Sequence, residues 1–225
     1  METTVEHGHV IRANGIDIHY LERGAGRPLL LLHGGLVSSS LRWAGIPVSY
    51  ASHLDTLASR FRVIAPDTRG CAHTAHTGGE AISFALLADD VAALIDALGL
   101  ERPLVAGFSE GAITATILAI RKPESVAALV NHAGHDFFNP QAKSYAIMRQ
   151  LFGGRADASQ TDPDAVERFF SQSERMRGMF ELMKQDQDEA RGAGYWRTYL
   201  ELASTARPAG PGIPSTTWRE SKRRR

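Results

Sequence analysis

Short, almost wholly apolar runs alternate with segments of helical periodicity, and this alternation constrains the fold more than any other feature of the chain. The apolar runs cover residues 28–32, 62–67, 103–106 and 126–130. The helical patterns lie between them, through 54–57, 83–98 and 112–121. A strand that is apolar along its whole length is buried on both faces, as in parallel sheets with helical connections. The sequence therefore predicts an α/β fold with a mostly parallel sheet and helices on both faces.

A β-hairpin is predicted before the first of these buried strands. Asn14-Gly15 is a strong two-residue turn signal, and Ile16, Ile18 and Tyr20 alternate with polar residues after it. The strand pattern stops near residue 136, and from 140 to about 203 the patterns are helical only.

This helical region carries two local signals. Asp162 precedes Pro163, the arrangement of an N-cap followed by proline at the first helical position. An apolar stripe is predicted to pack a helix against the core, with an adaptable ligand-facing surface as the alternative; it comprises Met176, Met179, Phe180 and Met183. We expect a core at 1–138, a helical cap at 139–205 and a disordered Pro/Gly/Arg-rich tail at 206–225.

Composition excludes several classes of protein. The 225 residues carry 25 basic and 25 acidic side chains, so overall charge favours neither nucleic acid nor an anionic membrane as a partner. The single cysteine, Cys71, excludes an intramolecular disulfide and a cysteine-rich metal site. The first residues lack the basic start and apolar stretch of a signal peptide, so we expect a cytoplasmic location. There is no phosphate-binding Walker pattern and no dinucleotide-binding Gly-x-Gly-x-x-Gly, and no cofactor is expected.

The run Gly107-Phe108-Ser109-Glu110-Gly111 follows a predicted strand and opens a predicted helix. Gly-x-Ser-x-Gly in that context is a nucleophile elbow, a turn too tight for side chains at its two glycine positions. The turn lifts the Ser109 hydroxyl above the sheet edge, where the helix N-terminus directs its N–H groups. Ser109 is therefore the candidate nucleophile.

A second glycine turn, His33-Gly34-Gly35-Leu36, follows the first buried strand. A loop at that position can supply one N–H of an oxyanion hole, and the backbone of Gly35 or Leu36 is the candidate donor. The N–H of Glu110 is the candidate for the other. Two donors placed where negative charge develops stabilise the transition state by about 3 kcal/mol each.

The order of four motifs resembles the α/β-hydrolase family, and most closely its small esterase-type members with a helical cap. The motifs read Leu-Leu-Leu-Leu-His-Gly-Gly, Val-Ile-Ala-Pro-Asp-Thr-Arg-Gly, Ala-Asp-Asp-Val-Ala-Ala-Leu-Ile-Asp-Ala-Leu-Gly and Gly-Phe-Ser-Glu-Gly. The resemblance covers roughly residues 8–205. It implies a serine that attacks an ester or related carbonyl, a histidine base, an acid that orients the histidine, and a cap formed by 140–203.

The chain departs from the family where the acid and base belong. The family's order is nucleophile, acid, histidine, and no histidine follows His135 in this chain. We therefore expect that the last strands of the fold are missing and that the sequence is truncated. His132, His135 and Asp136 follow the fourth buried strand and are weak candidates for base and acid; a polar loop beneath the cap is the favoured interpretation of these three residues.

The remaining reactive side chains receive structural interpretations. His33 is expected to brace the oxyanion loop, and Asp67 to shape the loop that follows its strand. His73 and His76 lie three residues apart without neighbouring carboxylates in the sequence, which is weak support for a metal site. Cys71 is not expected to act as a nucleophile, because no elbow surrounds it.

Two functions follow from these patterns. The leading hypothesis is a serine hydrolase that acts on a small, apolar ester, thioester or lactone. The alternative is a catalytically impaired member that binds a small hydrophobic ligand or a protein partner. Loss of the last strands would expose a sheet edge, and self-association through that edge is expected in that case.

Overall fold

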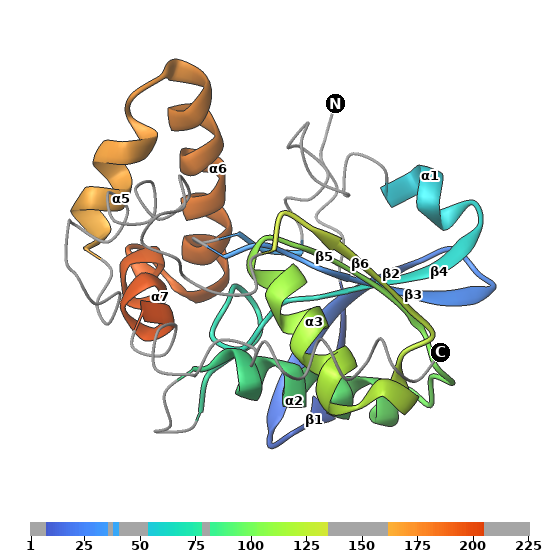
Figure 1. Cartoon of the computed structure of the whole chain (residues 1–225). Helices are drawn as coiled ribbons and strands as arrows, with labels where there is room; N and C mark the ends of the chain where they lie inside the picture. Colours follow the sequence, from blue (N-terminus) through green and yellow to red (C-terminus); the bar gives the residue numbers. More distant parts are fainter. Residues whose placement is uncertain (1–7, 36–37, 41–53, 78–81, 135–161, 205–225) are drawn as a thin grey trace, which may run out of the picture.

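A six-stranded mixed sheet forms the centre of the molecule (Figure 1). This computed structural model describes residues 8–35, 38–40, 54–77, 82–134 and 162–204. The strands are β1 (His9–Ala13), β2 (Ile16–Arg23), β3 (Arg27–Leu32), β4 (Phe61–Pro66), β5 (Leu104–Phe108) and β6 (Ala128–His132). Their order across the sheet is β1-β2-β4-β3-β5-β6. β1 and β2 form the predicted hairpin, and β2 also pairs antiparallel with β4. The other three pairs of neighbouring strands, β3 with β4, β3 with β5 and β5 with β6, are parallel, as predicted.

Helices cover both faces of this sheet (Figure 1). α2 (Phe84–Ala97) and α3 (Glu110–Arg121) lie on one face, a short 3₁₀ turn follows at Pro123–Ser125, and α1 (Leu54–Ala58) lies on the other face. The side chains of β3 alternate between the two: Leu30 and Leu32 pack toward α2 and α3, whereas Leu29 and Leu31 pack with Leu54. A strand buried on both faces must be apolar throughout, which explains the unbroken leucine run.

The predicted boundaries of the later elements need small corrections. The helix expected at 83–98 spans Phe84–Ala97, because the Ser83 side chain caps its start and Leu98 ends it. The helix expected from 112 begins at Glu110, directly after the elbow serine. The last strand begins at Ala128 instead of 126 and ends at His132. His132 is therefore a strand residue, not a loop residue after the strand.

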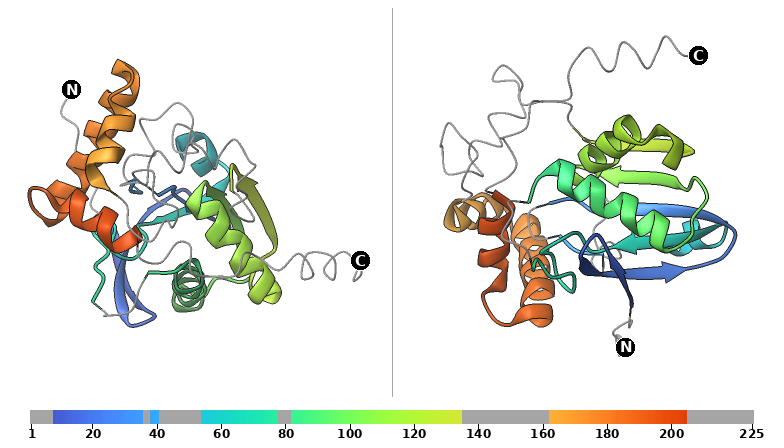
Figure 2. Two further views of the ribbon diagram at one scale, coloured as in Figure 1. Left: turned by 60° about the vertical axis from the view of Figure 1, so that its left-hand side comes forward. Right: turned by 90° about the horizontal axis from the view of Figure 1, so that it is seen from below.

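Of the strands that the structure describes, β6 lies at the edge of the sheet beyond β5, beside α3 in Figure 2. Most of its residues are exposed, and the Val130 side chain is 54% exposed. An edge strand presents unpaired backbone N–H and C=O groups on its outer side. Among the described residues, the edge at which self-association is expected lies at β6.

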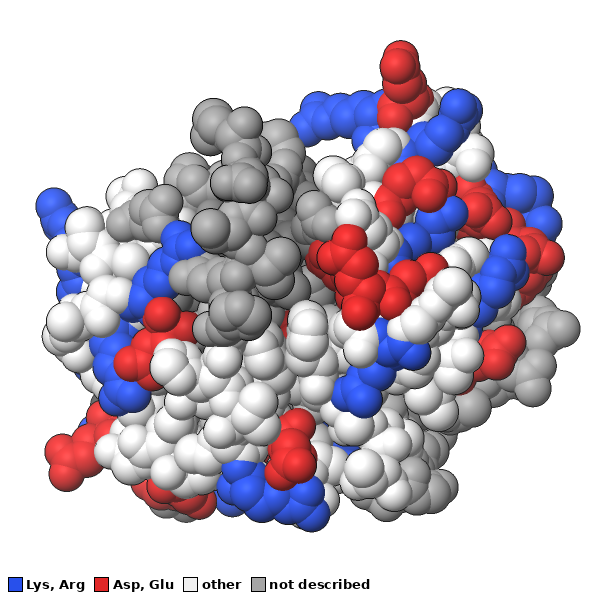
Figure 3. All heavy atoms as spheres, turned by 180° about the vertical axis from the view of Figure 1, so that it is seen from behind, with Lys and Arg blue, Asp and Glu red and all other residues white. Residues whose placement is uncertain are grey.

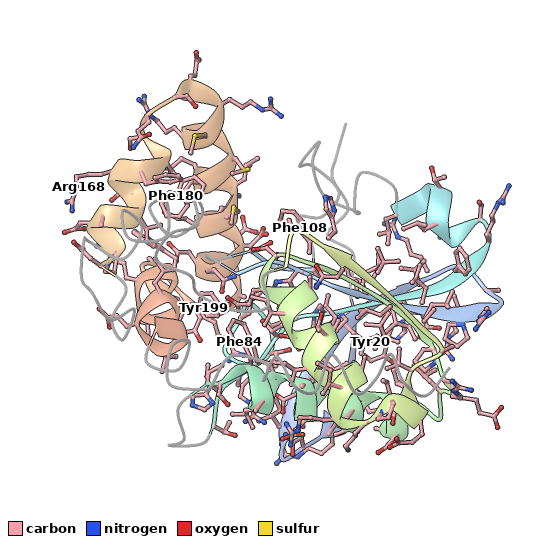
Figure 4. All side chains as sticks on the ribbon, viewed as in Figure 1. Tyr20, Phe84, Phe108, Arg168, Phe180 and Tyr199 are labelled. Carbon is pink, nitrogen blue, oxygen red and sulfur yellow. The ribbon has the colours of Figure 1, made fainter. Side chains whose placement is uncertain are left out.

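Three helices pack together beside the ends of the strands: α5 (Pro163–Phe170), α6 (Glu174–Arg191) and α7 (Tyr195–Ser204) (Figures 1 and 4). Phe180 lies at their centre; it stacks on Phe170 with ring centroids 4.7 Å apart and meets the edge of Trp196 at 5.5 Å. The methionine stripe packs into this cluster, which confirms the predicted role. Asp162 caps α5 through a 2.9 Å bond from the Asp164 amide, also as predicted.

Acidic and basic side chains are interspersed over the face shown in Figure 3. None of the described helices is long and apolar enough to cross a membrane. The predicted tail, 206–225, and the predicted start of the cap, 140–161, lie outside the described residues.

Candidate active site

Ser109 occupies the turn between β5 and α3 in a strained backbone conformation, as predicted. Its φ of 51° and ψ of −112° lie in a region that side chains rarely adopt and that costs about 1–3 kcal/mol. A Cβ on Gly107 would overlap the Gly111 carbonyl, and one on Gly111 would overlap the Leu32 carbonyl. Both glycines are therefore required by the close approach of two strands and a helix.

Backbone hydrogen bonds hold the strained turn. The Ser109 amide donates to the carbonyl of His132 on β6 at 2.9 Å. The Ser109 carbonyl accepts the amides of Ala112 and Ile113, each at 3.1 Å, and so starts α3. The serine thus lies at a helix N-terminus, whose partial positive charge favours developing negative charge.

The predicted oxyanion loop lies against this turn. A Cβ on Gly34 would come 3.6 Å from the Ser109 Cβ and 3.1 Å from the Phe108 ring. Gly35 follows in a bend, and its carbonyl accepts the Ser38 amide at 3.4 Å. Leu36 lies outside the described residues, and the oxyanion roles of Gly35, Leu36 and Glu110 stay predictions.

His33 braces this loop instead of serving as a base, as predicted. The Thr68 amide donates to its Nε2 at 3.0 Å, so Nε2 carries no proton. Nδ1 then carries the proton and donates to the Gly34 carbonyl at 2.6 Å. The ring is 1% exposed, so both nitrogens are committed to fixing the loop between β3 and the elbow.

Asp67 accepts hydrogen bonds on both of its oxygens beneath the same loop. Its Oδ1 accepts the Ser40 amide at 2.7 Å, and its Oδ2 accepts His19 Nδ1 at 3.0 Å and the His73 amide at 3.3 Å. Burial raises the pKa of this carboxyl group, but the hydrogen bonds from His19 and His73 outweigh it and hold the pKa well below its usual range. Asp67 is therefore a buried carboxylate, and its predicted part in shaping a loop is confirmed.

The sequence interpretation of His73 was wrong in one respect. His73 does have a carboxylate neighbour, because its Nδ1 lies 3.6 Å from Asp67 Oδ2. That hydrogen-bonded carboxylate raises the pKa of His73. The contact was missed because it depends on the loop after β4 folding back, so that the His73 amide also donates to Asp67 Oδ2.

Cys71 is buried, and its surroundings are consistent with the expectation that it is not a nucleophile. Its thiol donates to the Ser38 carbonyl at 2.7 Å, and Gln187 Nε2 lies 3.2 Å from the sulfur. Burial raises the pKa of the thiol, and the nearby negative charge of Asp67 raises it further. A neutral thiol in this position packs and hydrogen-bonds but does not attack substrates.

Hydrogen bonds join the α5–α7 helices to the segments that follow β3 and β4. Ser39 Oγ donates to Asp186 at 2.6 Å, and the Ala72 amide donates to Gln187 at 2.7 Å. Tyr195 donates its hydroxyl to the Gly70 carbonyl at 2.8 Å. A recess lies between α7, α2 and the elbow, lined by Thr68, Arg69, Ile82, Phe84, Glu110 and Tyr199. Tyr199 of α7 therefore shares a recess with Glu110 beside the elbow, and a cap over the active site stays a prediction.

The base and acid are not found in the described part of the chain. Among those residues, the Ser109 hydroxyl has no hydrogen-bond partner. The ring of His132 packs edge-on against Phe108, with centroids 5.2 Å apart. His135 and Asp136 lie outside the described residues.

Comparison with known proteins identifies the family. A family model described as the alpha/beta hydrolase fold matches residues 27–203. The chain belongs to the α/β-hydrolase family. This α/β hydrolase is 32% identical to a 2-hydroxymuconate semialdehyde hydrolase of Pseudomonas sp. (strain CF600) over 163 residues, which cover 67% of the chain and 55% of the relative. It is 32% identical to a soluble epoxide hydrolase of Corynebacterium sp. (strain C12) over 131 residues. These residues cover 57% of the chain and 42% of that relative.

Solved structures show the same fold. A meta-cleavage product hydrolase from Pseudomonas fluorescens IP01 superposes with a TM-score of 0.63 at 22% identity, covering 96% of this α/β hydrolase and 72% of that chain. An enol-lactonase from Burkholderia xenovorans LB400 superposes with a TM-score of 0.59 at 20% identity. The match covers 87% of this chain and 73% of the enol-lactonase. The α/β hydrolase spans about half the length of the curated relatives that it matches.

Proposed function

We propose that Ser109 is the nucleophile of a hydrolase that acts on a small, apolar ester, thioester or lactone. The observation that carries the proposal is the strained backbone of Ser109 between two glycines that no other residue can replace without overlap. Strain of this kind persists where the surrounding structure enforces it, and it concentrates at active sites. The relatives named above are a semialdehyde hydrolase and an epoxide hydrolase, so they support a hydrolase, whereas the ester class rests on the serine elbow alone.

The proposed reaction is acyl transfer. The Ser109 oxygen bonds to the carbonyl carbon while its proton passes to a base, the leaving group departs, and water then hydrolyses the acyl-enzyme. Negative charge develops on the carbonyl oxygen in both steps. We place that oxygen between the N–H of Glu110 and the N–H of Gly35 or Leu36, with each donor worth about 3 kcal/mol in the transition state.

Turnover by this chain depends on whether a base reaches Ser109. A serine hydroxyl is a weak nucleophile until a base accepts its proton. Without one, the oxyanion donors and binding alone give about 10³–10⁴-fold catalysis over water, a small part of the full effect. We therefore expect the wild-type chain to hydrolyse p-nitrophenyl acetate barely above background. Rapid turnover would instead indicate a base in this chain, and His132→Ala would be the first variant to measure.

The decisive experiment replaces the nucleophile with one that needs no base. In Ser109→Cys the thiolate is nucleophilic by itself, and the α3 N-terminus lowers its pKa. We expect a stoichiometric burst of p-nitrophenol from p-nitrophenyl acetate, with the acyl group mapped to residue 109 by mass spectrometry. The native Cys71 is buried with a raised pKa and stays silent.

The matched control is Ser173→Cys, at the N-cap of α6. Ser173 also lies at a helix N-terminus and accepts the Met176 amide at 3.2 Å, but it is exposed and outside the elbow. Because one oxyanion donor is worth about 10²–10³ in rate, acylation at residue 109 should be at least about 100-fold faster than at residue 173. Equal rates at the two positions would reject the elbow as a catalytic site and favour the alternative of an impaired member that binds a hydrophobic ligand or a protein.

A further inference from the structure

Three metal-ligating side chains converge on one point beside the loop that follows β4. They are His19 on β2, Asp67 after β4 and His73 in the loop, and one ligand atom of each lies within 4.8 Å of the other two. Asp67 Oδ2 is 3.0 Å from His19 Nδ1 and 3.6 Å from His73 Nδ1. We propose that these residues form a binding site for a divalent transition-metal ion of the Zn²⁺ class, with the fourth position open to solvent.

The separations suit a tetrahedral ion. Zn²⁺ binds imidazole nitrogen and carboxylate oxygen at about 2.0–2.2 Å, which places neighbouring ligand atoms of a tetrahedron about 3.3–3.6 Å apart. The two measured separations, 3.0 Å and 3.6 Å, lie at or near that range. The third separation, between the two imidazole nitrogens, is within 4.8 Å, so the rings must turn for all three atoms to reach bonding distance.

The surroundings hold the ligands in place. The other oxygen of Asp67 accepts the Ser40 amide at 2.7 Å, so Oδ2 is the oxygen that faces both imidazoles. The Asp67 amide donates to the His19 carbonyl, and the His19 amide donates to Thr74 Oγ1, each at 2.9 Å. Supporting bonds of this kind orient metal ligands and raise affinity. The ion would fasten β2 to the 67–74 loop.

Access and the type of donor atoms also favour this site. The His19 and Asp67 side chains are 9% and 0% exposed, whereas His73 is 40% exposed, so an ion can enter from the His73 side. Two neutral imidazoles and one carboxylate form a nitrogen and oxygen donor set that suits Zn²⁺ and its neighbours in the transition series.

A second group of potential ligands around Asp67 is less suitable. His33 and Cys71 also have ligand atoms close to Asp67. Both His33 nitrogens are committed to the Gly34 carbonyl and the Thr68 amide, and the Cys71 thiol donates to the Ser38 carbonyl. All three of these residues are buried, whereas the group with His73 reaches solvent, so the structure favours the half-exposed group.

The test is metal titration of the purified chain with any affinity tag removed. We expect Co²⁺ to bind with one-to-one stoichiometry and to give the intense visible bands of a four-coordinate site, and Zn²⁺ to displace it. His73→Ala removes the half-exposed ligand with little risk to folding. It should weaken Co²⁺ and Zn²⁺ binding by at least the ~10–100-fold that loss of a supporting residue alone causes.

The matched control is His9→Ala, an exposed histidine on β1, opposite Tyr20 and next to His19 in the hairpin. It should bind Co²⁺ as the wild type does, and circular dichroism should show that both variants are folded. Absence of Co²⁺ binding to the wild type, or equal binding by His73→Ala and the wild type, would overturn the proposal. The readout is independent of Ser109 and its chemistry.

Discussion

At the scale of single residues, Ser109 depends on glycines that leave no room for a side chain. The methyl group of Gly107→Ala would overlap backbone atoms of α3, which cannot move without displacing the elbow. We expect this substitution to lower the free energy of unfolding by about 3 kcal/mol or more, as measured by urea denaturation.

Gly178 is the control for this prediction. It lies in the middle of α6, is exposed, and has open space where its Cβ would be. Gly178→Ala should therefore raise the free energy of unfolding by about 0.5–1 kcal/mol, because alanine loses less conformational freedom in a helix. Equal effects at the two positions would show that the elbow tolerates a side chain and that its geometry is not enforced.

At the scale of elements, the pairing of β2 with β4 includes an ion pair that responds to pH. Arg62 donates to both oxygens of Glu22, at 2.8 Å and 3.0 Å. This hydrogen bonding lowers the pKa of Glu22 below its usual 4.5, despite the opposing effect of partial burial. A carboxyl group whose pKa is lower in the folded chain stabilises the fold above about pH 4.5, and that stability is lost as the pH falls through the folded-state pKa.

Arg62→Met tests this pair. Because the side chains are 33% and 25% exposed, we expect the variant to be less stable by only about 0.5–1 kcal/mol at pH 7. The difference from wild type should shrink at pH 3, where Glu22 is increasingly protonated. Arg12→Met is the control, because the Arg12–Asp17 pair is about two-thirds exposed and should contribute little at either pH. If the stability difference between Arg62→Met and wild type does not change with pH, the Glu22–Arg62 ion pair is not its cause.

The helices and strands themselves were largely predictable from the sequence. The side-chain contacts between elements that are distant in the sequence were not. Buried strands and the elbow follow from local signals, such as the leucine run of β3 and the two glycines around Ser109. The cluster of His19, Asp67 and His73 requires the register that sets Tyr20 opposite Pro66, and no local pattern specifies it. For the same reason, the hydrogen bonds that fix the His33 tautomer could not be derived from the sequence.

At the scale of the whole molecule, the two edges of the sheet differ. β1 carries a charged residue, Arg12, which discourages pairing with another strand. β6 has no Lys, Arg, Asp or Glu, and its Val130 is 54% exposed. The uncharged edge is therefore the one suited to pair with a strand of a second molecule.

We accordingly expect concentration-dependent self-association through β6, measurable by sedimentation velocity. Burying one valine contributes about 1.5 kcal/mol, so Val130→Lys should raise the dissociation constant roughly tenfold or more, since a buried charge adds its own cost. Val10→Lys is the matched control, because Val10 is 65% exposed on the opposite edge strand. If Val10→Lys disrupts association and Val130→Lys does not, the contact uses the β1 edge. A monomer at all concentrations would show that neither edge pairs, and that the exposed valine of β6 is tolerated as it stands.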